Sequence, residues 1–321
     1  MTSEFDIIAR YFAPLAAESA LGLTDDAAYL TPPEGCDLVL TKDALVEGVH
    51  FRSEDAPDLV AQKLARVNLS DLAAKGARPL GYLLATAFPD MMTEDWVAGF
   101  AAGLKADQEA FGWALLGGDT VSTSGPFTLT LTAIGAVRRG QMVRRGGGVV
   151  GDLLFVTGSI GDGFLGLEVL EKGLPSDGSD WLVDRYLRPQ PRLALGEKLP
   201  GIASGAVDIS DGLIADLEHL ADASGVRAKI DLTRIPLSEP AQALVLEDRV
   251  SLEELATGGD DYELCIAVSP DRREALIEIA AATQTRITEI GYLTGGEGVE
   301  VLGEGGKRID LKTKGYDHFS E

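Results

Sequence analysis

The chain has 321 residues, of which 51 are acidic and 28 are Lys or Arg, so its formal net charge is −23. A molecule this acidic repels nucleic acids and anionic membranes, and it needs metal ions or a few well-placed Arg and Lys side chains to hold an anionic ligand. The length predicts two domains, and a hydrophobic content of 45% excludes a disordered chain.

The start of the chain and its cysteines predict a cytoplasmic protein. Residues 1–15 lack the basic start and apolar centre of a secretion signal, and no apolar run reaches the length of a membrane span. Cys36 and Cys265 are the only cysteines and lie far apart in sequence, which is typical of a reduced compartment. None of the three histidines stands in ligand spacing, so the sequence argues against a zinc site.

Strands and helices alternate in the first part of the chain. The patterns predict strands at 37–51, 81–88, 113–120 and 127–137, and helices at 59–74 and from a Thr93 cap to about residue 111. Residues 138–152 are basic and rich in glycine, which makes them the best candidate for a domain boundary. We therefore expect one domain over 1–138 and another over 149–321, joined by a linker at 139–148.

Alternation continues beyond the linker. The patterns predict a strand, a glycine turn and a helix over 153–170, helices on both sides of the prolines in 179–199, a strand and a helix over 206–220, strands at 227–232, 262–268 and 286–293, a helix at 271–284 and a hairpin at 298–311. The glycine turn at 158–163 is either an ordinary strand-to-helix turn or a phosphate cradle. Arg144 and Arg145 are either a phosphate clamp or solvated linker charges.

Acidic residues recur at the ends of apolar segments, bracketed by Gly, Ser or Thr. They are Asp25, Asp26, Asp43, Asp71, Asp119, Asp208, Asp211, Asp260 and Asp261. One interpretation is a set of caps and turns. The other is a site for several Mg²⁺ ions, because carboxylates about 4 Å apart repel by roughly 4 kcal/mol at an effective dielectric constant of about 20 and need cations between them. Capping explains Asp208 poorly, because strand alternation places it on one face with Ser210.

Seven motifs, ordered along nearly the whole chain, resemble those of the thiamine-monophosphate kinase family: TDDAAYL, TKDALVEGVHF, VNLSDLAAKGARP, LLGGDT, DISDGLIADL, GGDDYEL and KGYDHF. That family belongs to the PurM-like ATP-binding superfamily. The resemblance implies an α+β fold of two domains, an N-terminal α/β domain with a dimer-forming sheet and a C-terminal α/β domain. It also implies a homodimeric enzyme that uses ATP and several Mg²⁺ ions to convert thiamine monophosphate directly to thiamine diphosphate.

The resemblance further implies roles for individual residues. The metal ligands would be Asp26, Thr41, Lys42, Asp43, Asp71, Asp119, Asp208 and Asp211. The ATP contacts would be Gly118, Asp119, Arg145 and Ser210. The contacts to thiamine monophosphate would be His50, Asp260 and Tyr316.

The chain departs from the family pattern at Thr24, where Gly is frequent, at Lys42, where Thr or Ser is frequent, and at Asp260, where Glu is frequent. Strand alternation predicts that the Lys42 side chain points away from Thr41 and Asp43, which leaves the Lys42 carbonyl for a metal. The alternative is an ammonium group that contacts a phosphate directly.

The expected chemistry needs no general base, because a phosphate monoester acceptor is already ionised at neutral pH. Catalysis of this kind consists of positioning and charge neutralisation. The chain has no P-loop motif and no protein-kinase motif set. Two rival functions remain open at this point: another PurM-like ATP-dependent synthetase, and a non-enzymatic acidic protein that binds divalent metals.

Overall fold

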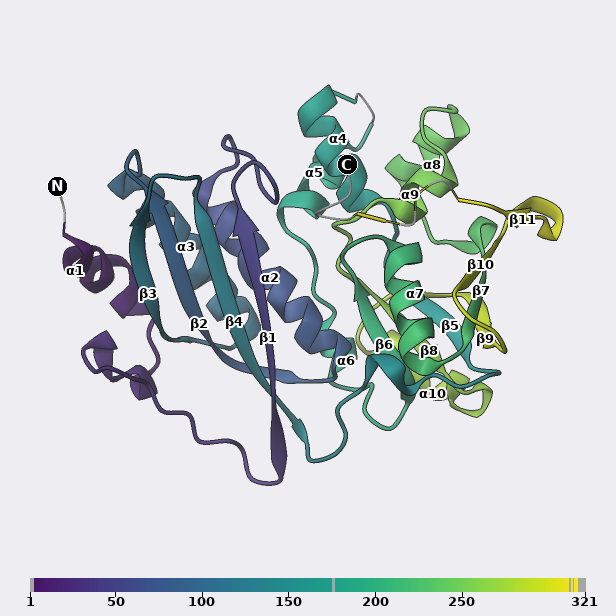
Figure 1. Cartoon of the computed structure of the whole chain (residues 1–321), viewed down its shortest axis with the longest axis horizontal. Helices are drawn as coiled ribbons and strands as arrows, with labels where there is room; N and C mark the ends of the chain where they lie inside the picture. Colours follow the sequence, from purple (N-terminus) through teal and green to yellow (C-terminus); the bar gives the residue numbers. More distant parts are fainter. Residues whose placement is uncertain (1–2, 175–176, 312, 314, 317–321) are drawn as a thin grey trace. The chain divides into compact units, whose positions relative to one another are not determined.

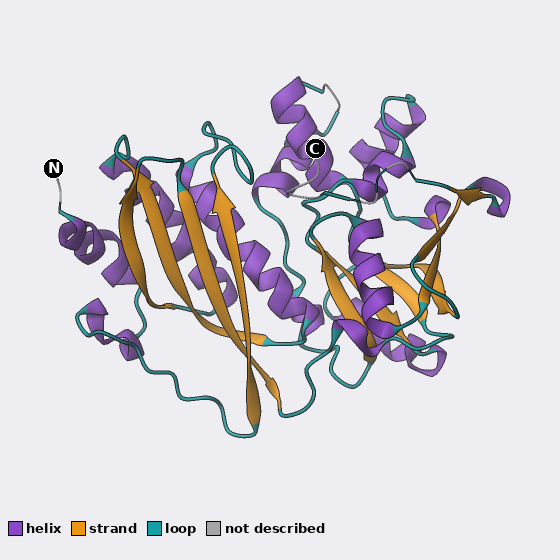
Figure 2. Ribbon diagram, viewed as in Figure 1, coloured by secondary structure: helices purple, strands orange, loops and turns teal. Residues whose placement is uncertain are grey.

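The computed structural model describes residues 3–174, 177–311, 313 and 315–316. The chain divides into two compact units. Unit 1 comprises the chain up to Leu72 together with Ala77–Gly140, and unit 2 comprises Ala73–Gly76 and the chain from Gln141 onward. The division after Gly140 lies inside the stretch 139–148 that the sequence indicates as a linker. Each unit has its own sheet (Figure 2).

Unit 1 is built on a four-stranded sheet in the order β1-β4-β2-β3, in which β2 and β3 are parallel and the other neighbours are antiparallel. The strands are β1 (Cys36–Val46), β2 (Arg78–Pro89), β3 (Leu115–Thr123) and β4 (Thr128–Arg138). The helices are α1 (Glu4–Ile7), α2 (Pro57–Ala74) and α3 (Glu94–Phe111). Figure 1 shows α2 and α3 on the same face of the sheet. The predicted Thr93 cap is confirmed, since its side chain accepts a hydrogen bond from the Trp96 N–H.

Alternation along the strands gives this sheet two different faces. On β4, Leu129 and Leu131 are fully buried on the face that α2 and α3 cover, whereas the threonines that alternate with them, at 128, 130 and 132, are half-buried. The opposite face, here called the open face, carries Leu38, Leu40, Leu83 and Val121, which are 36%, 63%, 41% and 49% exposed. Unit 1 therefore has one packed sheet face and one apolar face that its described residues leave exposed.

The first strand is shorter than predicted. It ends at Val46, because Gly48 has φ +78° and its N–H donates to the Phe51 carbonyl at 2.8 Å, which turns the chain back. The strand prediction was therefore wrong for residues 47–51.

Unit 2 is built on a seven-stranded sheet in the order β11-β10-β7-β9-β5-β8-β6. The strands are β5 (Leu153–Thr157), β6 (Ala203–Ile209), β7 (Arg227–Asp231), β8 (Glu263–Val268), β9 (Ile287–Thr294), β10 (Val299–Leu302) and β11 (Arg308–Ile309). The helices are α4 (Asp162–Lys172), α5 (Ser179–Leu187), α6 (Leu193–Gly196), α7 (Leu213–Ser224), α8 (Glu239–Leu246), α9 (Leu252–Thr257) and α10 (Arg273–Ala282). The predicted hairpin is confirmed as the antiparallel pair β10–β11.

The main core of unit 2 lies between α7 and the sheet. Leu217 and Leu220 of α7 pack with Val207 and Ile209 of β6, and all four are buried. A smaller core joins α4, α5, α8 and α9, of which α8 and α9 were not predicted. Among the described residues, no helix combines the length and apolar character that a membrane span requires.

Candidate active site

Predicted site residues of unit 1 meet where β1 faces α2. The Thr41 hydroxyl donates a hydrogen bond to the Asp71 carboxylate, and the Asp43 N–H donates to Asn68 Oδ1 at 3.2 Å. Thr41 and Asp43 share the helix-covered face of β1, since their cross-strand partners on β4 are buried. This arrangement collects two carboxylates and one hydroxyl beside the last turns of α2.

Lys42 lies on the other side of the same strand. It is exposed and stands opposite the half-buried Thr132 of β4, on the open face. Strand alternation therefore turns its side chain away from Thr41 and Asp43, as the sequence predicts. Binding of a metal by the Lys42 carbonyl stays a prediction.

A second group of unit 1 lines a cavity of about 530 Å³ at the β3 edge of the sheet. Asp26, Gly118 and Asp119 lie on its wall, together with apolar side chains that include Phe12 and Leu116. A Cβ atom on Gly118 would lie 1.7 Å from the Leu84 carbonyl oxygen, so only glycine fits there. The cavity thus combines an apolar lining with two carboxylates and a glycine backbone.

The structure does not bring these two groups of unit 1 together. Strands β1 and β3 are the opposite edges of the sheet, three strand spacings or roughly 14 Å apart. Asp119 pairs with Ala85 and lies on the open face, whereas Asp43 lies on the helix-covered face. Within one copy of the chain, Asp43 and Asp119 are therefore too far apart to share an ion.

His50 lies in the turn that follows β1. Its Nδ1 accepts a hydrogen bond from the Val46 N–H at 3.1 Å, and its carbonyl oxygen accepts one from Lys63 Nζ at 3.0 Å. An imidazole that accepts at Nδ1 carries its proton on Nε2. His50 is thus held as a hydrogen-bond donor at Nε2.

In unit 2, the predicted acidic motif lies between β6 and α7. Asp208 is only 7% exposed, at the end of β6, and Ser210 and Asp211 follow. The N-cap residue of α7 is Gly212, at φ +115°, and no side-chain hydrogen bond caps this helix. The capping interpretation of Ser210 and Asp211 is therefore wrong.

Two distant segments meet this loop through main-chain hydrogen bonds. The Asp260 N–H donates to the Ser210 carbonyl at 2.8 Å, and the Tyr316 N–H donates to the Asp211 carbonyl at 3.0 Å. Asp260 has φ +67°, and a Cβ atom on Gly315 would lie 2.6 Å from the Asp211 oxygen. Unit 2 therefore brings its predicted metal and nucleotide residues beside its predicted substrate residues. Only Gly315 and Tyr316 of the motif at 314–319 lie within the described residues.

Asp261 has a different role from Asp260. Its buried carboxylate accepts hydrogen bonds from the N–H groups of Gly161, at 2.8 Å, and Gly163, at 3.2 Å. Burial raises the pKa of Asp261 well above its usual range, against the effect of these donors. The start of α4 thus binds a carboxylate of the chain itself, so the phosphate-cradle interpretation of the glycine turn at 158–163 is wrong.

Sequence reasoning missed the ion cluster around Glu263, a fully buried residue of β8. Arg185 Nη2 and Arg192 Nε donate to its carboxylate at 2.8 and 2.6 Å, and the Thr157 hydroxyl donates at 2.6 Å. Arg185 also donates to the Asp261 carbonyl at 3.4 Å. The cluster anchors the chain just after Asp260. Its only signal in the sequence is the Glu in GGDDYEL.

Arg145 lies in the short 3-10 helix η4 (Arg145–Gly147). The Ala206 N–H donates to the Arg144 carbonyl at 3.1 Å, so this segment runs beside β6. Burial and the Asp211 carboxylate raise the pKa of Asp216 to about 7, against the positive charge of Arg145. The positive charge of Arg145 therefore acts on the Asp216 carboxylate in the first turn of α7.

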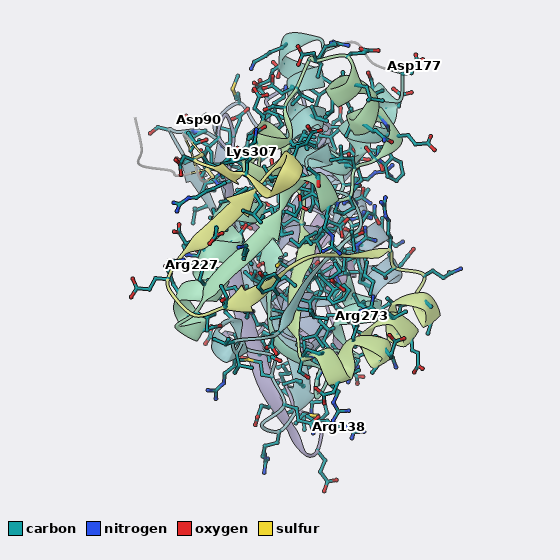
Figure 3. All side chains as sticks on the ribbon, turned by 90° about the vertical axis from the view of Figure 1, so that its right-hand side faces the viewer. Asp90, Arg138, Asp177, Arg227, Arg273 and Lys307 are labelled. Carbon is teal, nitrogen blue, oxygen red and sulfur yellow. The ribbon has the colours of Figure 1, made fainter. Side chains whose placement is uncertain are left out.

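Two other cations of unit 2 belong to ion pairs near the surface. Arg227 and Arg273, labelled in Figure 3, lie within 3.8 Å of Glu300 and 3.2 Å of Glu289. Such partly exposed pairs contribute little to stability.

The predicted metal ligands offer hydroxyl, carboxylate and carbonyl oxygens as donor atoms. Within the described ranges, no three His, Cys, Asp or Glu side chains are grouped so that they alone would hold a metal. Mg²⁺ usually binds proteins through one or two carboxylates and takes its other ligands from water and substrate phosphates. The donors therefore fit Mg²⁺ that arrives with phosphate better than a permanently caged ion.

Two family models match the chain: AIR synthase related protein, N-terminal domain, over residues 24–137, and AIR synthase related protein, C-terminal domain, over residues 149–304. A thiamine-monophosphate kinase of Caulobacter vibrioides is 46% identical over 311 residues, which cover 94% of this chain and 87% of the relative. The chain belongs to the thiamine-monophosphate kinase family. Another member, from Escherichia coli K12, is 39% identical over 99% of this chain and 98% of its own length.

Solved structures of the thiamine-monophosphate kinase family have the same fold. The enzyme from Stenotrophomonas maltophilia K279a matches with a TM-score of 0.81 and 39% identity over 89% of this chain and 91% of that one. AaThiL complexed with AMPPCP and TMP matches with a TM-score of 0.79 and 32% identity over 92% and 91%. The family and the α+β fold of two PurM-like domains are thus confirmed. The family assignment also removes the two rival functions.

Proposed function

We propose that this chain transfers the γ-phosphoryl group of ATP directly to the phosphate of thiamine monophosphate, giving ADP and thiamine diphosphate. The observation that carries the proposal is the pair of main-chain hydrogen bonds that hold Asp260 and Tyr316 against Ser210 and Asp211. Expected substrate contacts thereby adjoin expected metal and nucleotide contacts. Relatives that bear the name of this kinase, and AaThiL complexed with AMPPCP and TMP, support the same reaction.

ATP contacts Gly118, Asp119, Arg145 and Ser210 in this proposal. The cavity of about 530 Å³ beside Gly118 is large enough for a nucleotide base, and its apolar lining suits an aromatic ring. The guanidinium of Arg145 supplies positive charge for a phosphate in a molecule that is otherwise strongly acidic.

Several Mg²⁺ ions accompany the phosphates. Their proposed ligands are Asp26, Thr41, Lys42 through its carbonyl, Asp43, Asp71, Asp119, Asp208 and Asp211. When bound, Mg²⁺ neutralises the phosphate oxygens of two polyanions that would otherwise repel each other. In the free protein, Thr41 holds the Asp71 carboxylate by a hydrogen bond.

In this proposal, His50, Asp260 and Tyr316 bind thiamine monophosphate, including its acceptor phosphate. His50 donates from Nε2, since its Nδ1 already accepts the Val46 N–H. Tyr316 is 54% exposed and offers a ring face for stacking on the thiamine. No side chain acts as a general base, because the acceptor is an ionised phosphate.

The active form is a homodimer joined through the open face of unit 1. An exposed apolar patch of this kind marks a protein interface, and Leu40, at 63% exposure, lies within it. Asp119 lies on the same face, so a second copy seated there would adjoin an expected metal ligand. We also propose that the protein works in the cytoplasm, a reduced compartment, as its two cysteines predict.

An assay of ADP release tests the reaction. We expect Mg²⁺-dependent turnover with thiamine monophosphate and little turnover with thiamine, because an alcohol acceptor requires a general base and the proposal assigns that role to no residue. Similar rates with both compounds would contradict direct phosphate-to-phosphate transfer. A chain that binds Mg²⁺ and releases no ADP with either compound would contradict the enzymatic function.

A further inference from the structure

Asp216 lies in the first turn of α7 and is only 3% exposed. One of its carboxylate oxygens, Oδ2, accepts hydrogen bonds from the N–H groups of both Ser210 and Asp211, each at 3.0 Å. The side chain thus reaches back across Gly212 to the loop that precedes its own helix. The roles proposed above do not include it.

Two consecutive N–H groups that converge on one oxygen fix the orientation of two successive peptide units. The carbonyl oxygens of the same two residues, Ser210 and Asp211, accept the N–H groups of Asp260 and Tyr316 at 2.8 and 3.0 Å. The Asp216 carboxylate is therefore linked, through the main chain of Ser210 and Asp211, to two segments that are distant in sequence.

We infer that Asp216 is a positioning residue for both substrates: it fixes the loop of Ser210 and Asp211 and, through the carbonyls of that loop, the chain at Asp260 and Tyr316. The inference rests on the proposed function, which assigns the nucleotide and metal contacts to the first pair and the thiamine monophosphate contacts to the second. Asp216 acts through the main chain and touches neither substrate.

At the position of Asp216, an apolar residue would stabilise the fold better than a carboxylate does. The neighbouring core positions of α7 are filled by Leu213, Ile214 and Leu217, and a carboxylate buried beside them has a desolvation cost that an apolar residue would not have. The two hydrogen bonds that the carboxylate accepts from Ser210 and Asp211 offset part of that cost. Precise orientation of the loop explains why the residue is acidic.

Turnover of the full-length protein distinguishes the role of the oxygen from that of the charge. Asp216→Asn keeps an oxygen that accepts both N–H groups, so kcat should stay within about tenfold of the original. Asp216→Ala removes the acceptor, and a displaced loop should lower kcat about a hundredfold and raise the Mg²⁺ concentration needed for half-maximal rate. The matched control is Asp231→Ala, since Asp231, the last residue of β7, also accepts two hydrogen bonds, both from Thr233. This variant should change neither kcat nor the Mg²⁺ requirement.

Amide hydrogen exchange without metal or substrate supplies a second measurement. Asp216→Ala should accelerate exchange at Ser210, Asp211, Asp260 and Tyr316, whereas Asp216→Asn and Asp231→Ala should leave these four amides protected. If the alanine variant fails to fold, Asp216→Glu, which displaces the carboxylate by one methylene, takes its place with the same expectation.

Three results would overturn the inference: original kcat and Mg²⁺ dependence in Asp216→Ala, unchanged exchange at the four amides, or an asparagine variant as inactive as the alanine variant. The last result would mean that the charge matters rather than the oxygen. The exchange experiment stands apart from the proposed function, because it needs no turnover. Absence of kinase activity in the unsubstituted protein would contradict the proposed function but would not contradict the role of Asp216 in holding the loop.

Discussion

The Thr41 hydroxyl donates a hydrogen bond to the Asp71 carboxylate, which joins the helix-covered face of β1 to α2. Asp71 stands in the last turns of α2, where a negative charge opposes the helix dipole. An acid at this position has a small cost in the free protein, and a bound cation would offset that cost. The pair is therefore the clearest place in unit 1 to separate ligand function from structural stability.

We expect Asp71→Asn to lower turnover at least about a hundredfold, the scale of one lost electrostatic stabiliser. Its amide oxygen still accepts the Thr41 hydroxyl, so the free energy of unfolding should be unchanged or slightly higher. Turnover and urea unfolding measure the two effects. The control is Asp95→Asn, an exposed acid in the first turn of α3, which should keep full turnover. A less stable Asp71→Asn variant with normal turnover would make Asp71 structural.

Lys42 and Asp43 should differ sharply although they are neighbours. Lys42→Thr changes a side chain that points to the open face and leaves the carbonyl in place, so turnover should stay within about tenfold, or 1.4 kcal/mol. Asp43→Asn should be severely impaired. Turnover measured against Mg²⁺ concentration compares the two variants. Equal impairment, or a higher Mg²⁺ requirement in Lys42→Thr, would show that the ammonium group is part of the site.

The open face predicts the oligomeric state. Leu40→Glu places a negative charge on the open face, at its most exposed apolar side chain among those named above, so we expect the dimer to dissociate and turnover to fall at low protein concentration. Leu246→Glu is the matched control, because Leu246 is 80% exposed on α8 of unit 2. Sedimentation velocity gives the mass of each variant. A fully active monomer of the original chain would refute the proposed interface.

The Glu263 cluster predicts a large effect on stability. Arg185→Met removes one of two guanidinium partners from a fully buried carboxylate, and we expect a loss of about 3–5 kcal/mol in the free energy of unfolding. Adding Glu263→Gln should recover much of this loss, because the buried charge is then gone. Denaturant unfolding of the single and the double variant measures the loss in the free energy of unfolding and its recovery.

The control for this cluster is Arg273→Met, which breaks the partly exposed pair with Glu289. It should cost at most about 1 kcal/mol. Equal losses from Arg185→Met and Arg273→Met would mean that water reaches Glu263 and that the cluster does not hold the chain after Asp260.

Local sequence patterns determined several helices and strands, one side-chain direction and the family of this protein. The Thr93 cap, the helix that follows it and the direction of the Lys42 side chain depend on residues within one or two turns, so they follow from the sequence alone. The seven ordered motifs similarly identified the family. Segments with weak periodicity, such as α8 and α9, escaped notice because packing on α4 and α5 stabilises them.

Tertiary structure alone decided how the acids differ. Asp260 and Asp261 are neighbours with the same side chain, yet one joins the Ser210 loop and the other binds the start of α4. Strand order likewise places Asp43 and Asp119 on opposite edges of one sheet. Strand pairing and burial depend on which distant segments pack together, and the free energy of those contacts is not present in any local stretch of sequence.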